Sequence, residues 1–520
     1  MILIHPPVVK PCEPPAGLAK LAGVMYDHGI PCKVIDANLE GFSSLFQEEG
    51  EAYKHERRTN DKNRAIPENM MNNWTNRSFL HLESNVAALT SCETYKNIDR
   101  YKRAVVDLSR VLEVAASRSD AYLSLSNYLN PNLSPVRSAD LIRASETPEH
   151  NPFYVYFRKR LMAMLEDENP STVGFSLNYL SQALCTFAMI GFLKRQCPGI
   201  RVVLGGGLAT SWARRPGWSN PFGGLVDDIV AGPGEAALLS MHGVACGQCQ
   251  HTPCHASSSM ERYLSPGFIL PYSASSGCYW NRCSFCPEKA EGNPYEPVPV
   301  EKAIADIRSL AERTKPALVH LLDNAISPAL LKAIAESSFR FPWYAFAKIT
   351  PHLMDPDFCR ALKQSGCVML QLGLESGDQD ILDSMQKGFE LRIASAALSA
   401  LEKAGIATYV YLIFGTPSET IAEARKTLDF AVQHSGQIDF LNLAIFNLPA
   451  YSPEARQLEV SDFYAGDLSL YRDFLHPRGW KRGLVRQFLD KEFKRHPAIA
   501  SILRKAPPIF TSNHAPFFIM

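Results

Sequence analysis

The sequence lacks any apolar run of the ~18 residues that a membrane-spanning helix requires, so we expect no membrane partner. It also lacks an excess of either charge, because Lys and Arg together number 53 and Asp and Glu together number 53. A net charge of zero gives no general reason to expect nucleic acid or an acidic surface as partner. Internal repeats and low-complexity tracts are absent.

The first residues are not expected to act as a secretion signal. The start, "MILIHPPVV", has no basic region, and two prolines interrupt its apolar residues. Thirteen cysteines in such a chain indicate reduced thiols that serve metal binding or catalysis. The expected location is the cytoplasm.

The chain has enough length and apolar residues for more than one domain. Its 520 residues with 46% hydrophobic side chains predict two or three domains, each with its own core. Apolar strands alternate with helices near the N-terminus and again after residue 172, which favours a parallel, doubly wound sheet. In the first of these parts, the strand "PCKVID" is expected to end in a polar loop, "ANLEG". Residues 43–165 are polar and mostly helical in pattern and are interpreted as an insertion.

A second array of strands and helices follows residue 266. Six strands are predicted, over 268–274, 318–322, 343–347, 368–373, 407–414 and 440–446. Helical segments separate most of them, which indicates a partial (β/α)6 barrel with its chemistry in the loops after the strands. The α/β chain is therefore divided into a doubly wound domain at 1–245, a bridge at 246–266, the barrel at 267–452 and a mixed, partly helical tail at 453–520.

The loop after the first barrel strand, "SSGCYWNRCSFCPEK", concentrates three cysteines: Cys278, Cys283 and Cys286. Three is an odd number for disulfides and one fewer than a closed structural zinc site uses. Thiolates suit zinc, copper(I) or iron–sulfur clusters. On a 4Fe–4S cluster, three thiolates would leave one iron open to a substrate or cofactor.

This loop and its place in a six-unit array resemble those of the radical S-adenosylmethionine (SAM) superfamily. The family's usual spacing is Cys-x3-Cys-x2-Cys, whereas this chain has Cys-x4-Cys-x2-Cys. The segments "LLDNAI", "QLGLESGD" and "LIFGTPSET" follow in the order of the family's SAM-binding strands. The resemblance implies that the three cysteines hold a 4Fe–4S cluster whose fourth iron SAM chelates. The implied SAM-side residues are Phe285, Asp323, Asn324, Glu375 and Gly415.

The N-terminal part resembles the cobalamin-binding domain found in one group of that superfamily. The cobalamin signature Asp-x-His-x-x-Gly reads "DANLEG" here, with Asn38 in place of the histidine. "STVGFSLNY", "VVLGGGLAT" and "VDDIVAGPGEAAL" complete the resemblance. It implies cobalamin-side positions at Asn38, Ser176, Gly205, Gly206, Gly207 and Glu235. An empty Rossmann-like sheet is the alternative.

The resemblance implies a cobalamin-dependent radical SAM enzyme, a methyltransferase that uses a 5′-deoxyadenosyl radical and methylcobalamin on a small molecule or peptide. The implied electron donor is a flavodoxin or ferredoxin. A non-methylating rearrangement or cyclisation is one alternative, and an iron–sulfur sensor without turnover is another. In the bridge, Cys246, Cys249 and Cys254 stand near three histidines and form either a metal site or a surface loop with reduced thiols.

Overall fold

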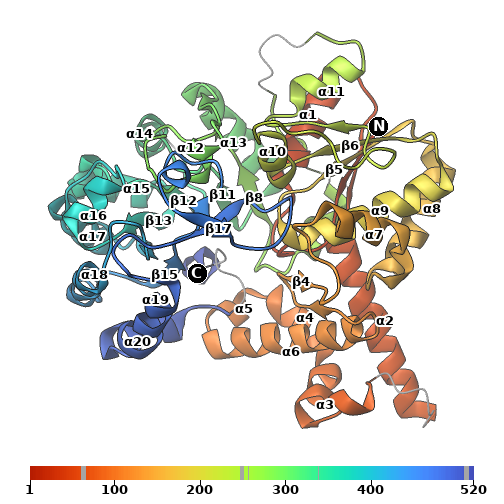
Figure 1. Ribbon diagram of the computed structural model, residues 1–520, viewed down its shortest axis with the longest axis horizontal. Helices are drawn as coiled ribbons and strands as arrows, with labels where there is room; N and C mark the ends of the chain where they lie inside the picture. The colour runs from red at the N-terminus through yellow and green to blue at the C-terminus, as the bar shows by residue number, and fades with distance from the viewer. Residues whose placement is uncertain (60–65, 246–250, 256, 338, 509–513, 520) are drawn as a thin grey trace. The chain divides into compact units, whose positions relative to one another are not determined.

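The computed structural model describes residues 1–59, 66–245, 251–255, 257–337, 339–508 and 514–519. The chain divides into two compact units, one of residues 1–268, 465–469 and 508–510 and one of residues 269–464, 470–507 and 511–520. Figure 1 labels many of the helices and strands of both units. None of the helices in the described ranges is both long enough and apolar enough to cross a membrane.

The first unit contains a five-stranded parallel sheet with the order β2-β1-β5-β6-β7. Apolar runs form its strands, and Ile2, Ile4, Val173 and Val202 are all buried. A buried cluster that includes Leu3, Leu18 and Leu238 joins β1 to helices α1 and α11. The strands and the helices between them are β1 (Ile2–His5), α1 (Ala16–Asp27), β2 (Lys33–Asp36), β5 (Thr172–Ser176), α9 (Leu180–Gln196), β6 (Arg201–Gly205), α10 (Gly207–Ala213), β7 (Asp228–Ile229) and α11 (Glu235–Met241).

This strand order places the carboxyl ends of β1 and β5 side by side. From β1 the chain continues to β2 on one side of the sheet, and from β5 it continues to β6 and β7 on the other side. Such a switch point opens a crevice at the carboxyl edge of an open parallel sheet, and ligands bind there in many α/β proteins. The loops that follow β1 and β5 are therefore the parts of this unit to inspect for a cofactor.

The segment between β2 and β5 is predominantly helical. Its elements are α2 (Ala37–Thr59), α3 (Asn73–Leu80), α4 (Leu82–Leu89), α5 (Cys92–Tyr95), α6 (Ile98–Ser117), the strand pair β3 (Tyr122–Leu123) and β4 (Tyr128–Leu129), α7 (Ser138–Glu146) and α8 (Tyr154–Glu168). The polar loop predicted at "ANLEG" is wrong, because α2 begins at Ala37 directly after β2. The Asp36 carboxylate accepts the N–H of Leu39 at 2.9 Å and so satisfies a donor of the first helical turn.

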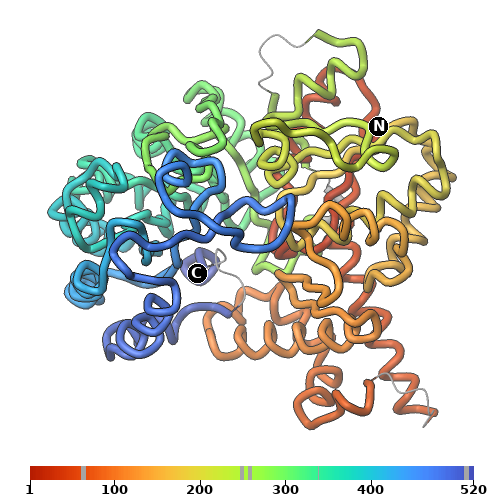
Figure 2. Tube along the Cα trace, viewed as in Figure 1, coloured from red at the N-terminus to blue at the C-terminus, as the bar shows by residue number. Residues whose placement is uncertain are grey.

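The second unit contains a six-stranded parallel sheet in which the strands follow one another in chain order, from β8 to β15. All six predicted strands are present, and the green-to-blue trace in Figure 2 alternates between strands and helices. The elements are β8 (Ile269–Tyr272), α13 (Val300–Thr314), β11 (Leu318–Leu321), α14 (Pro328–Glu336), β12 (Trp343–Ala347), α15 (Pro356–Gln364), β13 (Cys367–Glu375), α16 (Gln379–Ser384), α17 (Leu391–Ala404), β14 (Ala407–Phe414), α18 (Ile421–Gln433) and β15 (Phe440–Ile445).

A buried cluster fills the amino end of this sheet. It takes one or more residues from the early part of each of the six strands, among them Ile269, Tyr344 and Phe440, together with Ala515 from a 3-10 turn near the C-terminus. Side chains of both edge strands and the central strands meet in it, so the sheet is curled around this core. Since packing closes the amino end, the carboxyl end is where loops can build a site.

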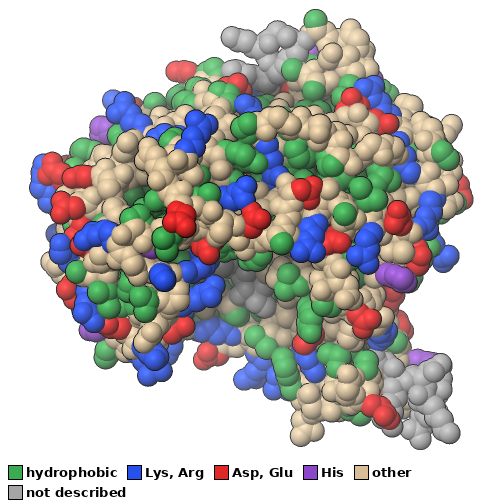
Figure 3. All heavy atoms as spheres, in the orientation of Figure 1, with side chains coloured by type: hydrophobic (Ala, Val, Ile, Leu, Met, Phe, Trp, Pro, Cys, Tyr) green, Lys and Arg blue, Asp and Glu red, His purple; other side chains and the backbone are tan. Residues whose placement is uncertain are grey.

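The remaining elements of the second unit are short. Those in the cysteine loop are β9 (Ser275–Ser276), α12 (Pro287–Ala290) and β10 (Glu296–Pro297). Those after β15 are β16 (Leu448–Pro449), β17 (Val460–Asp462), β18 (Tyr471–Phe474), α19 (Arg482–Phe488), a π-helix at Leu489–Phe493 and α20 (Pro497–Lys505). On the face drawn in Figure 3, basic and acidic side chains are interspersed, so no large field of one sign covers it.

Candidate functional site

The three cysteines of the loop lie together, partly buried, between β9 and α12. Burial, with a smaller contribution in the same direction from the neighbouring thiols of Cys283 and Cys278, raises the pKa of the Cys286 thiol to about 11. Burial likewise raises the pKa of Cys283, although the nearby Lys387 ammonium opposes this. A buried group of thiols therefore favours the thiolate form only with a positively charged partner such as a metal.

The loop is not arranged for a single ion. Within the described ranges, no group of three or more His, Cys, Asp or Glu side chains is placed to hold one metal ion. Each cysteine of a 4Fe–4S site binds a different iron atom, so the sulfurs of such a site need not converge on one point. The arrangement of the three thiols is therefore compatible with such a cluster.

Asp323 and Asn324, which follow β11, hold the start of the cysteine loop. The Asp323 carboxylate accepts the backbone N–H of Ala274 at 3.1 Å and a hydrogen bond from the Ser275 hydroxyl. Asn324 donates its side-chain N–H to the carbonyl of Gly277 at 3.3 Å. Burial raises the pKa of Asp323. Both residues therefore fix the backbone just before Cys278.

Glu375 ends β13 and forms a buried ion pair. Its Oε1 lies 3.0 Å from Nζ of Lys387, and each side chain is only 7% exposed. Oε2 has no hydrogen-bond partner among the described residues and remains available to a ligand. The backbone of Glu375 has φ +70° where the pairing of β13 with β14 shifts register. A side chain on Gly373 would strike the carboxylate at 2.5 Å, so the glycine makes room for it.

The segment from Met385 to Gly388 supports the cysteine loop from the other side. The carbonyl of Met385 accepts the N–H of Ser284 at 3.1 Å, and the carbonyl of Gln386 accepts the indole N–H of Trp280 at 2.9 Å. Gly388 has φ +68°, and a Cβ there would lie 2.1 Å from the Trp280 ring. The loop and this segment therefore fit closely only because position 388 is glycine.

Two lysines stand beside the cysteines. The Lys387 Nζ lies 5.6 Å from the Phe285 ring centre, and Lys348, directly after β12, places its Nζ 4.1 Å from the Trp280 ring centre. Burial, with a smaller contribution from the charge of Lys387, lowers the pKa of Lys348 to about 8. For Lys387, burial opposes the charge, but Glu375 and Cys283 outweigh it and raise its pKa. The lysines make the surroundings of the cysteines electropositive.

Sequence reasoning missed both lysines. Lys348 directly follows a predicted strand. That position could have identified it, because the reactive residues of such barrels lie at the ends of the strands and in the loops after them. Lys387 sits in "MQKGF", twelve residues beyond Glu375, and nothing in the local pattern shows that this loop turns back toward the strand.

Gly415 follows β14 with φ +83° and donates its N–H to the carboxylate of Glu419. The same carboxylate oxygen accepts the indole N–H of Trp480 at 3.2 Å. Burial raises the pKa of Glu419 to about 8. The Gly415 turn is thus tied to the C-terminal segment and lines a cavity there.

In the first unit, the Asn38 side chain is committed to the backbone. It is 2% exposed, and its Oδ1 accepts the N–H of Val9 at 2.8 Å. From α9, Ser181 and Gln182 donate to the carbonyls of Val8 and Pro6, each at 2.8 Å. The loop after β1 is therefore held from both α2 and α9 at the switch point. His5, at the end of β1, keeps a buried Nδ1 without a partner in the described chain.

Ser176 and the three glycines meet at the ends of β5 and β6. Asn178 donates to Ser176 Oγ at 3.0 Å and accepts the N–H of Gly207 at 3.0 Å. A side chain on Gly206 would collide with the Leu177 backbone at 2.5 Å, whereas one on Gly205 or Gly207 would meet nothing closer than 3.8 Å. Gly206 thus serves local packing, and the backbone at its two neighbours is open.

The remaining predicted positions lie elsewhere in the first unit. Glu235, at the start of α11, is 4% exposed and pairs with Lys20 of α1 at 2.7 Å. Cys246 and Cys249 lie outside the described residues. Cys254 is exposed, and its backbone N–H donates to the carbonyl of Ala19 at 2.8 Å. His251 Nδ1 lies 2.6 Å from an oxygen of Asp27.

Two curated proteins are similar to parts of the chain. Bacteriochlorophyllide d C-12(1)-methyltransferase of Chlorobaculum tepidum is 30% identical over 176 residues, which are 32% of this chain and 38% of that protein. An uncharacterised methyltransferase of Pyrococcus horikoshii is 25% identical over 182 residues, which are 33% of this chain and 39% of that protein. The matched segments thus span about four-tenths of each relative's length.

A solved structure has a similar fold over most of the chain. The radical S-adenosylmethionine methyltransferase TsrM of Kitasatospora setae, with tryptophan substrate and a SAM analogue bound, matches with a TM-score of 0.53 at 15% identity, covering 98% of this chain and 89% of that one. TsrM with cobalamin and a 4Fe–4S cluster bound matches with a TM-score of 0.51 at 16% identity, covering 88% and 74%. At these identities the likeness concerns the fold.

One family model matches within the chain. The Radical SAM superfamily model covers residues 272–431, which run from the end of β8 into α18 and include the three cysteines and Glu375. The second unit of this chain therefore contains a radical SAM domain.

Proposed function

We propose that the chain is a cobalamin-dependent radical SAM enzyme that methylates a small molecule. The observation that carries the proposal is the buried three-cysteine loop at the carboxyl end of the curled sheet, within the segment that matches the radical SAM family. The two methyltransferase relatives and the TsrM fold support the transfer of a methyl group.

The residues present fit a 4Fe–4S cluster and SAM. Cys278, Cys283 and Cys286 supply three thiolate ligands on one loop and leave a fourth coordination position for the cofactor. Lys387 and Lys348 would stabilise the thiolates electrostatically. The free Oε2 of Glu375 suits a hydroxyl or amino donor of SAM.

The residues of the first unit fit a bulky cofactor at the switch point. The open backbone at Gly205 and Gly207 and the unpartnered Nδ1 of His5 lie at the carboxyl ends of β6 and β1. TsrM, whose fold is similar, has been solved with cobalamin bound. We assign cobalamin to this edge, with Asn38 as a support of the β1 loop.

When bound, these groups would supply a 5′-deoxyadenosyl radical from SAM and a methyl group from cobalamin. The chain itself contributes position and exclusion of water. Asp323 and Asn324 fix the start of the cysteine loop, while Trp280 and Gly388 close the loop against its neighbouring segment. Holding reactants in a fixed arrangement and keeping water away from radicals is what such proteins provide. A flavodoxin or ferredoxin would supply the electron.

The test uses anaerobically purified, reconstituted protein with SAM and a chemical reductant. We expect 5′-deoxyadenosine, and we expect S-adenosylhomocysteine when cobalamin is present, since the latter reports methyl transfer from SAM. Changing any one of the three cysteines to alanine should remove the iron absorbance and SAM cleavage, whereas Cys197→Ala, at a partly exposed thiol of the first unit, should preserve both.

5′-Deoxyadenosine without S-adenosylhomocysteine would exclude methylation and favour a rearrangement. Absence of both products from a protein with a full iron complement would exclude catalysis of this kind.

A further inference from the structure

A cavity of about 390 Å³ lies beside the carboxyl ends of β14 and β15 in the second unit. Gly415 and Ile445 form its floor, and the C-terminal strands β17 and β18 and the start of α19 form its walls. Its volume falls within the range of small-molecule sites. Because it opens at the same end of the sheet as the cysteine loop, a molecule in it would lie on the reactive side of the domain.

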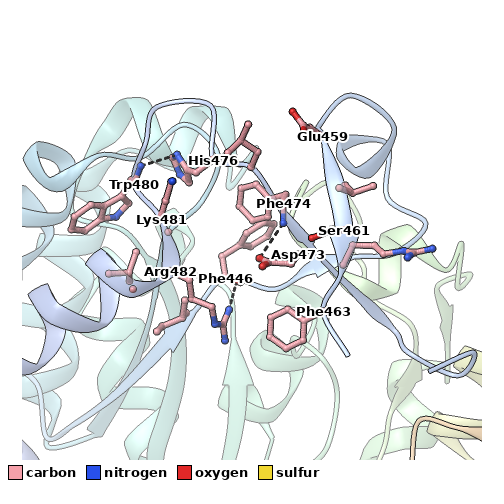
Figure 4. A pocket seen from close by; sticks show the side chains of 17 residues that line it. Phe446, Glu459, Ser461, Phe463, Asp473, Phe474, His476, Trp480, Lys481 and Arg482 are labelled. Atoms are coloured by element: carbon pink, nitrogen blue, oxygen red, sulfur yellow. Dashed lines mark hydrogen bonds between the residues drawn. The ribbon is translucent and has the colours of Figure 1, made fainter. Parts of the chain in front are cut away.

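Aromatic rings make up much of the wall. Phe446 and Phe474 pack edge to face with ring centres 5.8 Å apart, and Phe463 lies opposite, with its ring centre 4.8 Å from Cζ of Arg482. Figure 4 shows Phe446, Phe463 and Phe474 around the middle of the cavity. Such walls bind a planar apolar group through edge and face contacts.

Arg482 is the basic group at the base of this cavity. Its Nη1 donates to the carbonyl of Phe446 at 3.1 Å and to Oδ1 of Asn447 at 2.9 Å, which fixes the guanidinium. Nη2 has no hydrogen-bond partner among the described residues. Burial lowers the pKa of Arg482, and the nearby charge of Arg486 lowers it further. A guanidinium held in this way is suited to a carboxylate.

Asp473 supplies the opposite charge. One of its oxygens accepts the backbone N–H of Phe474 at 3.0 Å, which orients the side chain, and its carboxylate acts electrostatically on Arg482. A ligand with only a carboxylate would be repelled by Asp473. A ligand that carries a carboxylate and an ammonium together would satisfy both side chains.

His476 does not take part in recognition. Its Nε2 donates to the carbonyl of Thr416 at 2.8 Å, while its Nδ1 accepts the N–H groups of Arg478 and Trp480, each at 3.2 Å. Both ring nitrogens are thus occupied by the backbone. The charges available to a ligand come from Arg482, Asp473 and neighbouring exposed side chains such as Lys481.

We infer that this cavity binds the substrate and that the substrate is a free aromatic α-amino acid. Its carboxylate would lie on Arg482, its ammonium on Asp473 and its ring among the three phenylalanines. Because the inference names the substrate class of the proposed methyltransferase, it rests on the proposed function. An aromatic residue within a peptide would present the same ring, but it would lack the free carboxylate and the free ammonium.

Calorimetry with L-tryptophan, L-phenylalanine, indole-3-propionate and N-acetyl-L-tryptophan amide tests the inference on the full reconstituted chain. Arg482→Gln should weaken L-tryptophan and indole-3-propionate at least tenfold. Asp473→Asn, which keeps the acceptor for the Phe474 N–H, should weaken L-tryptophan about tenfold and strengthen indole-3-propionate, because the carboxylate of Asp473 no longer repels it. The uncharged amide should bind at least tenfold more weakly than L-tryptophan.

Arg486→Gln is the matched control, because it removes the same charge four residues along α19 from a side chain that does not line the cavity. It should change L-tryptophan binding less than twofold. Iron content and circular dichroism should be unchanged in all three variants, which shows that they fold.

Equal L-tryptophan affinity in the wild type and Arg482→Gln would overturn the inference. Binding of the amide as tightly as the free amino acid would also overturn it and point to a peptide. If no aromatic amino acid binds to protein that cleaves SAM, the cavity assignment alone is wrong. If binding follows the expected pattern but SAM is not cleaved, the proposed function fails and the amino-acid site stands.

Discussion

Lys387 Nζ lies 3.0 Å from Oε1 of Glu375, and the two side chains form a buried ion pair at the end of β13. The pair lies between the cysteine loop and β13, because Lys387 also lies 5.6 Å from the Phe285 ring centre. Removing one partner of such a pair leaves an uncompensated charge in a largely buried site, which is more costly than removing both.

Lys387→Met should therefore destabilise the protein by ~3–5 kcal/mol, because the Glu375 carboxylate loses its counter-ion. The double variant Lys387→Met with Glu375→Gln removes both charges and should recover most of that loss. Urea unfolding followed by intrinsic fluorescence would measure both. A double variant as unstable as Lys387→Met would show that the packing of the lysine side chain, and not its charge, accounts for the lost stability.

Glu375→Gln should weaken SAM binding while leaving the cluster spectrum intact. Losing one charged acceptor for a buried ligand donor costs ~1–3 kcal/mol, so the dissociation constant should rise by a factor of roughly 5 to 150. Equilibrium dialysis of SAM against reconstituted protein gives the affinity, and the visible absorbance reports the cluster. Unchanged affinity would assign Glu375 to packing of the strand end alone.

The sequence was sufficient to locate the six strands of the second unit, because each is a short apolar run between helical segments. It was also sufficient to place the cysteine loop after the first of them. Strands that alternate with helices are typical of a parallel sheet, because the connecting helices cover both of its faces.

Contacts distant in sequence could not be predicted in the same way. Lys387 reaches Glu375, and Trp480 reaches Glu419 from 61 residues away, only because the chain folds back. The helix at Ala37 was missed for a local reason, since "DANLEG" has turn-forming residues and Asp36 works as a helix cap instead. Asn38 consequently faces the β1 loop rather than standing free.

Gly388→Ala should expose the cluster to oxygen. A Cβ at this position would lie 2.1 Å from the Trp280 ring, so the indole must leave its place and lose its hydrogen bond to Gln386. Gly405→Ala is the control, because Gly405 has φ +70° but a Cβ there would meet nothing closer than 3.9 Å. Loss of the cluster absorbance in air should be several-fold faster in Gly388→Ala than in Gly405→Ala. Equal rates would mean that backbone strain, not Trp280, controls access.

Glu419 should make stability depend on pH. Its folded pKa is about 8 against 4.5 for the unfolded chain, because the carboxyl is buried. Between these values the folded state holds a proton that the unfolded state releases, so the free energy of unfolding falls as pH rises. The slope from this group approaches ~1.4 kcal/mol per pH unit. Glu419→Gln keeps the acceptor for Gly415 and Trp480 and should remove this slope between pH 5 and 8.

Urea midpoints of the wild type and Glu419→Gln, compared at each pH, isolate the contribution of Glu419 from that of other groups. The midpoint of the wild type should decline relative to that of the variant as pH rises. Parallel curves would show that Glu419 is ionised throughout the range and that its two hydrogen bonds offset its burial.

The proposed cobalamin should have no nitrogen ligand from Asn38 on its lower face. The Asn38 side chain is 2% exposed, and its oxygen is already occupied by the N–H of Val9 at 2.8 Å. An amide is in any case a poor ligand for cobalt compared with an imidazole. Electron paramagnetic resonance of the cobalt(II) form should therefore lack the nitrogen splitting that an axial imidazole produces. Asn38→Ala, which removes the bond to Val9 but no cobalt ligand, should lower the stability of the β1 loop and leave the cobalt spectrum unchanged. A resolved nitrogen triplet in the wild type would contradict the prediction. If the triplet disappears in His5→Ala, the ligand is His5, whose buried Nδ1 has no partner within the described residues, and if it persists, the ligand is the cofactor's own benzimidazole base.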